Sequence, residues 1–125
     1  MDIVDLSDTS DDGVSRKHLS SRCDIKGRVY TIDLLIFVNG CFANISEDQS
    51  GKMGAISVSI KTGERATSTS LIPESKGNIF ARMVGELLAD KLRGIAIISL
   101  YLREELDAES MKTLINEVRK LLDKD

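Results

Sequence analysis

The segment Gln49-Ser50-Gly51-Lys52-Met53-Gly54 comes closest, in residue types and spacing, to a chemical motif, the phosphate-binding loop. Its glycines let the backbone bend sharply on either side of a lysine and a methionine. A phosphate-binding loop also needs a glycine five residues before the Gly-Lys pair and a serine or threonine directly after the lysine. This sequence has Ser46 and Met53 at those positions. We therefore interpret the segment as a turn that displays Lys52 and Met53 to another protein surface.

No other group of residues suggests a catalytic, metal or cofactor site. His18 is the only histidine, and Cys23 and Cys41 are 18 residues apart without the closely spaced ligands of a zinc site. We expect an exposed histidine and two reduced, partly buried thiols. Asp33 and Glu47 could in principle form an acid–base pair, but nothing in their spacing singles them out. The sequence therefore predicts that the protein is not an enzyme.

The elements that must position the turn are predicted as five strands, a helix, a strand and a helix. The strands are expected over about 16–25, 28–38, 41–46, 54–61, 64–71 and 95–102, and the helices over about 75–92 and 108–123. The last strand is apolar on both faces, which indicates a central strand covered on both sides. This order predicts an α+β fold, a mostly antiparallel six-stranded sheet with two amphipathic helices on one face.

The strand over 54–61 alternates between apolar and small side chains, with Ile56, Val58 and Ile60 on one face. Small residues of this strand and the next are expected to share the other face: Ala55, Ser57, Ser59, Ala66 and Ser68. They are too small for a thick core, yet they include almost no long charged side chain. Because small side chains let two sheets approach closely, we expect a second subunit to cover this face.

Composition indicates one folded domain over residues 15–125, preceded by an acidic, disordered tail over 1–14. The first 12 residues hold five aspartates and no base, so the remainder carries a net charge of +2, and its charges are interspersed. Such a surface does not favour nucleic-acid binding. Without an apolar run long enough for a membrane span, and with an acidic start unlike a signal peptide, a cytoplasmic protein is expected.

The tail contains Ile3-Val4-Asp5-Leu6, followed by serines and aspartates, a pattern typical of SUMO-interacting motifs. In such motifs a short apolar strand adds to the edge of a sheet, and the acidic residues meet a basic rim. The alternative interpretation is a tail that only keeps the protein soluble.

The order of the elements, together with the Gly-Lys-Met-Gly turn, resembles the proteasome assembly chaperone 3 family over about residues 16–122. Further support comes from the link Leu71–Pro73, from the helix start at Ile79, Phe80 and Ala81, and from the strand and helix after Gly94.

The resemblance implies a non-enzymatic chaperone of the cytoplasm, and also of the nucleus. It would dimerise with a similar partner, proteasome assembly chaperone 4, or with itself. The dimer would bind proteasome alpha-subunits and promote correct alpha-ring assembly without a nucleotide. The contact candidates are Gly51, Lys52, Met53 and Gly54 on the turn and Glu74, Ser75 and Lys76 before the helix. The alternative function is an α+β dimerisation or adaptor module that binds SUMO through residues 3–12.

Overall fold

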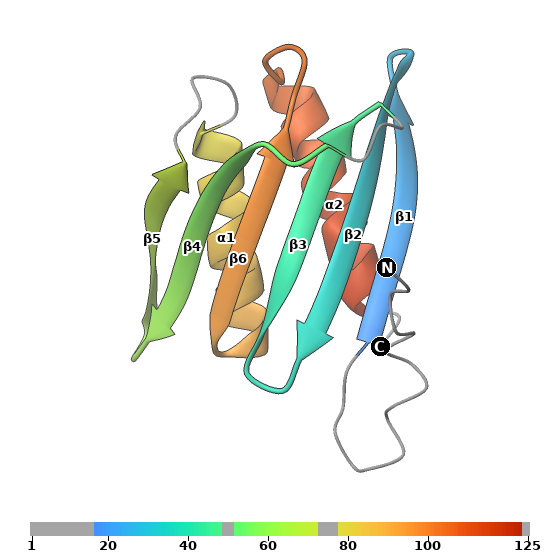
Figure 1. Ribbon diagram of the computed structural model, residues 1–125. Coiled ribbons are helices and arrows are strands. Elements are labelled where there is room, and N and C mark those ends of the chain that lie inside the picture. The colour runs from blue at the N-terminus through green and yellow to red at the C-terminus, as the bar shows by residue number, and fades with distance from the viewer. Residues whose placement is uncertain (1–16, 49–51, 73–77, 124–125) are drawn as a thin grey trace, which may run out of the picture.

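The computed structural model describes residues 17–48, 52–72 and 78–123. Its elements are β1 (Lys17–Ile25), β2 (Arg28–Phe37), β3 (Gly40–Glu47), β4 (Ala55–Thr62), β5 (Arg65–Ile72), α1 (Asn78–Leu92), β6 (Ile95–Tyr101) and α2 (Ala108–Asp123). The strands form one sheet, and both helices lie behind it in Figure 1. The predicted α+β fold and order of elements are confirmed.

The strand order in the sheet is β1-β2-β3-β6-β4-β5. Strand β6 therefore lies between β3 and β4; it runs parallel to β3 and antiparallel to β4. The first five strands consequently do not form the simple meander that their order suggests. To reach β4, the chain has to cross the end of β6, as Figure 1 shows.

Each helix packs an apolar stripe against the sheet. The stripe of α2 contains Leu114, Val118 and Leu121, which recur at three- and four-residue spacing and are buried. Asp107 caps this helix, because its Oδ1 accepts a hydrogen bond of 2.7 Å from the backbone N–H of Ser110. The sheet residues beneath the helices include Tyr30, Ile32, Leu34, Ile45, Ile98 and Leu100, all at most 1% exposed.

Helix α1 packs closely on β4 at Gly85. A Cβ atom at Gly85 would stand 2.3 Å from the Oγ of Ser59 and 3.3 Å from its Cβ. The hydroxyl of Ser59 pairs with that of Ser68 at 2.7 Å, and Ser68 donates to Oε2 of Glu86 on α1 at 2.9 Å. Small sheet residues and a helix glycine thus form one closely packed layer.

This layer corrects the sequence-based account of the small-residue face. The strand register places Ala55, Ser57, Ser59, Ala66 and Ser68 on the helix side of the sheet, in line with Leu100, Ile98 and Ala96 of β6. Ala55, Ser57 and Ser59 are buried within the single chain. The premise that the helices leave this face open is therefore wrong, and the argument that a second subunit must cover it no longer holds.

The expectation that β6 is covered on both faces also fails within this chain. Ala96, Ile98 and Leu100 are buried beneath the helices, but Ile95 is 40% exposed on the opposite side, and Ile97 is partly exposed there. The face of the sheet away from the helices is called the open face below.

Candidate protein-interaction surface

The segment 52–54 lies across the C-terminal end of β6 on the open face (Figure 1). The backbone N–H of Gly54 donates to Oγ of Ser99 at 3.1 Å. A Cβ atom at Gly54 would stand 2.2 Å from the carbonyl oxygen of Leu100. From the sequence, Gly54 is expected to let the chain bend. In the structure, the absence of a side chain at Gly54 lets two backbone segments come into close contact.

Lys52 and Met53 are displayed by this segment. The Nζ of Lys52 lies 5.1 Å from the ring centroid of Tyr101, within the range of a cation–π interaction. Met53 is 60% exposed, so its side chain does not turn inward toward the core. Of the other contact candidates, Gly51 and residues 74–76 lie outside the described residues.

Gly54→Ala is expected to lower the free energy of unfolding by about 1–3 kcal/mol, because the added methyl group forces two backbones apart. Urea unfolding followed by circular dichroism measures this change. Met53→Ala, which adds no atoms in the same segment, is the control and should stay within about 0.5 kcal/mol of the native chain. Equal unfolding midpoints for Gly54→Ala and the native chain would contradict the packing argument.

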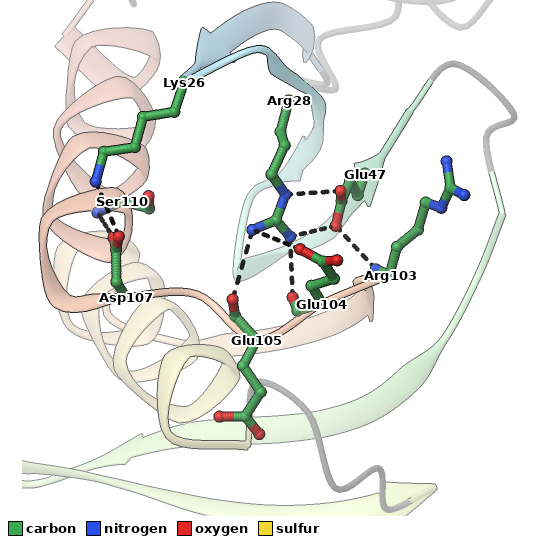
Figure 2. A network of polar contacts seen from close by, with 8 residues as sticks. All are labelled: Lys26, Arg28, Glu47, Arg103, Glu104, Glu105, Asp107 and Ser110. Atoms are coloured by element: carbon green, nitrogen blue, oxygen red, sulfur yellow. Dashed lines mark hydrogen bonds and ion pairs between the residues drawn. The ribbon is translucent and has the colours of Figure 1, made fainter.

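A partly buried ion pair organises the same end of the sheet (Figure 2). The guanidinium of Arg28 donates to both carboxylate oxygens of Glu47, at 2.8 Å from Nε and 2.6 Å from Nη2. The backbone N–H of Arg103 donates to the same carboxylate at 2.8 Å. These hydrogen bonds, that of Arg28 first, hold the pKa of Glu47 below its usual range.

The pair also fixes the loop between β6 and α2. Nη2 of Arg28 donates to the backbone carbonyl of Glu104 at 3.0 Å, and Nη1 reaches that of Glu105 at 3.5 Å. On the other side of the loop, Nζ of Lys26 lies 2.9 Å from Oδ2 of Asp107. Sequence reasoning considered Glu47 only as a scattered acid and assigned Arg28 no role.

The open face carries an apolar patch over the four central strands, β2, β3, β6 and β4. Leu35, Phe42, Ile97 and Val58 are neighbours across these strands in one row, and Phe37, Ile95 and Ile60 belong to the next. These seven residues are called the apolar patch below. All seven stand on inner strands of the sheet rather than on the edge strands β1 and β5, and a hollow of about 170 Å³ lies among Phe37, Phe42 and Ile97. A one-layered sheet normally presents polar residues to water, so this patch indicates a protein interface.

The remaining candidates for chemistry are dispersed. Both cysteines are free and buried, and burial raises the pKa of Cys41 to about 12. The side chain of His18 is 61% exposed, as expected for a surface residue. Asp33 lies on the open face and Glu47 on the helix face, so they form no pair.

Within the described parts of the chain, no cluster of three His, Cys, Asp or Glu side chains could hold a metal ion. In the same parts, no helix is long and apolar enough to cross a membrane. The SUMO-interacting candidates Ile3, Val4, Asp5 and Leu6 lie outside the described residues, so that prediction stays a prediction.

No protein-family model matches the chain, and no curated protein matches it by sequence. Among solved structures, the chain is similar to a subunit in the "Crystal Structure of a Novel Chaperone Complex for Yeast 20S Proteasome Assembly". The TM-score is 0.65 at 10% sequence identity, over 87% of this chain and 96% of the other. The two chains therefore share one fold along almost their whole length.

Proposed function

We propose that this chain is a non-enzymatic proteasome assembly chaperone that dimerises with a similar partner and binds alpha-subunits to promote correct alpha-ring assembly. The observation that carries the proposal is the fold likeness to a subunit of a yeast chaperone complex, at a TM-score of 0.65 over 96% of that subunit. The open sheet face of this chain, with its apolar patch, adds physical support for an interface. Proposed sites of action are the cytoplasm and the nucleus.

The apolar patch is the proposed dimer interface. When two sheets pack face to face, their side chains interdigitate in a layer about 10 Å thick. Partly exposed apolar residues such as Phe42 and Ile97 could fill such a layer. Sheet-on-sheet dimerisation was inferred from the sequence for the wrong face. The face proposed here is the opposite side of the same strands, where the apolar patch lies.

The client surface is proposed at the end of the sheet where segment 52–54 crosses β6. Lys52 supplies a cation and Met53 an adaptable apolar side chain, and the Arg28–Glu47 pair fixes the neighbouring loop. A transient chaperone needs a modest interface with polar contacts, so that later subunits can displace it.

Affinity purification of the tagged full chain from cells, followed by mass spectrometry, tests the function. Proteasome alpha-subunits without beta-subunits are the expected result. Recovery of SUMO conjugates alone would favour the adaptor function, and a preparation free of alpha-subunits would contradict the chaperone proposal.

The variant Lys52→Glu/Met53→Ala tests the client surface. We expect at least a fivefold loss of recovered alpha-subunits, equivalent to about 1 kcal/mol, with an unchanged melting temperature. Arg119→Glu, a charge reversal at an exposed position on α2, is the matched control and should keep full recovery. Equal recovery by both variants would remove segment 52–54 from the client surface.

A further inference from the structure

Helix α1 carries apolar side chains on its solvent side, away from the sheet. Ile79 is 72% exposed and Met83 is 45% exposed, and Leu87, one turn further on, is partly exposed. Their four-residue spacing places them in one row along the helix. The outward face of a helix in a soluble protein normally holds polar residues. This row therefore indicates a surface that another segment covers.

The row faces helix α2. Ala81 and Arg82 line a hollow together with Ser70 of β5, so they lie on the β5 side of α1. Successive residues of a helix are about 100° apart, which places Met83 and Leu87 on the other side. Because α1 packs on β4 and β6 and α2 packs on β1, that other side of α1 faces α2 (Figure 1).

Helix α2 presents a matching row toward α1. Glu117 accepts a hydrogen bond from Ser21 of the edge strand β1, so this side of α2 faces the edge of the sheet. The opposite side of α2 holds three partly exposed apolar residues: Met111, Ile115 and Leu122. These three residues, together with Met83 and Leu87 of α1, are called the inter-helix surface below.

Two lysines flank the inter-helix surface. Lys91 follows Leu87 by one turn on α1, and Lys112 stands next to Met111 on α2, and both lysines are exposed. In the part of the chain that the structure describes, neither lysine forms a salt bridge. The nearby acid Asp90 is already paired with a lysine of β4. The surface is therefore apolar, with a cationic border that favours an acidic occupant.

The N-terminal tail of the same chain can reach this surface. Strand β1 begins at Lys17, at the end of the sheet where β2 turns into β3. Both helices end there too, because β6 starts at that end directly after α1, and α2 runs back from the other end of β6 (Figure 1). The ten residues 7–16 can span up to about 33 Å, whereas a helix is about 10–12 Å wide. Residues 3–6 therefore lie within reach of both helices.

We propose that the N-terminal tail docks on the inter-helix surface of its own chain. Ile3, Val4 and Leu6 supply the apolar side chains, and the five aspartates of the tail supply the charge opposite Lys91 and Lys112. A weak contact is enough, because a tethered segment has an effective concentration of about a millimolar. The contact covers the exposed apolar row and engages the residues that SUMO would need. It is independent of the chaperone function.

Methyl NMR of the full-length chain, labelled with ¹³C at the methionine methyl groups, tests the contact. Among the four methionines, Met83 and Met111 report on the inter-helix surface, and Met53 reports on the segment at the open face. Ile3→Ser/Leu6→Ser should shift the signals of Met83 and Met111 by more than a linewidth, because these methyl groups lose their apolar cover. The signal of Met53 should stay in place.

Thr9→Ala/Ser10→Ala is the matched control in the tail, since it removes no apolar side chain and no charge, and it should leave the methionine signals unchanged. Lys91→Glu/Lys112→Glu reverses the charge of the border. It should move the signal of Met83, which lies on the other helix from Lys112, in the same direction as Ile3→Ser/Leu6→Ser does.

The proposal fails if either Ile3→Ser/Leu6→Ser or the lysine variant leaves the Met83 signal in place. An equal shift in the control, or an equal shift of Met53, would also overturn it, because neither is specific to docking at the helices. A shift that disappears on dilution would overturn it too, since the tail would then bind a second copy of the chain. None of these results changes the recovery of alpha-subunits, so the proposed function is tested separately.

Discussion

Glu47→Ala is expected to lower the free energy of unfolding by about 3 kcal/mol. Removing one partner of a buried ion pair usually costs about 3–5 kcal/mol, because the other charge remains without compensation. We take the lower end because 26% of the Arg28 side chain is exposed, while only 7% of the Glu47 side chain is. The change also frees the N–H of Arg103 and loosens the loop that Arg28 holds.

Urea unfolding monitored by circular dichroism measures this effect. Glu104→Ala is the control, since the carboxylate of Glu104 is exposed and 3.9 Å from Nη1 of Arg28. Its effect should stay within about 0.5 kcal/mol. If Glu47→Ala and Glu104→Ala unfold at the same urea concentration, the pair does not stabilise this end of the sheet.

The same pair gives a predicted pH dependence. Because the folded-state pKa of Glu47 lies below its unfolded value of about 4.5, its contribution to stability is complete above that value. The contribution is lost as the pH falls through the lower folded-state pKa. Unfolding of the native chain should therefore become easier between about pH 5 and pH 2, and Glu47→Gln should weaken this dependence. If the Glu47→Gln variant loses stability with falling pH as strongly as the native chain does, other carboxylates cause the acid dependence.

Local patterns in the sequence predicted the elements because each pattern records one face of one element. The two-residue alternation in Tyr30, Ile32 and Leu34 and the helical spacing in Leu114 and Val118 reflect burial against one neighbour. The capping aspartate, Asp107, acts within a single turn. Such signals need no knowledge of which strands pair.

Strand order and the choice of face depend on long-range packing, and there the predictions failed. Ile56 and Val58 are more apolar than Ser57 and Ser59, so the alternation assigned the apolar side of β4 to the helices. Close approach at Gly85 reverses this preference, since only small side chains fit beneath α1 there. The insertion of β6 next to β4 then extends the outward apolar row to Ile97.

The buried pair could have been found partly from the sequence. The Asn39-Gly40 turn pairs β2 with β3 and so brings Arg28 and Glu47 to the same end of neighbouring strands. The position of the Arg103 amide depends on the parallel pairing of β6 with β3, which no local pattern records.

Ile97→Asp is expected to weaken dimerisation at least a hundredfold, equivalent to about 2.7 kcal/mol. Ile97 lies on the central strand β6 and is the neighbour of both Phe42 and Val58 in the apolar patch. A carboxylate at this position would lose its water in a sheet-on-sheet dimer and meet apolar side chains. Phe42→Asp, on the adjacent strand, should act in the same direction.

Sedimentation equilibrium on the full chain, alone and together with the partner recovered from cells, measures the loss. Val38→Asp is the matched control, because Val38 is 77% exposed in the turn after β2 and outside the apolar patch. Circular dichroism melting separates a lost interface from a lost fold, since Ile97 contributes little to the core under the helices. If Ile97→Asp and Phe42→Asp both fold and dimerise as tightly as Val38→Asp, the partner must bind another surface. The outer edge of strand β5, at one end of the sheet, then becomes the next surface to test.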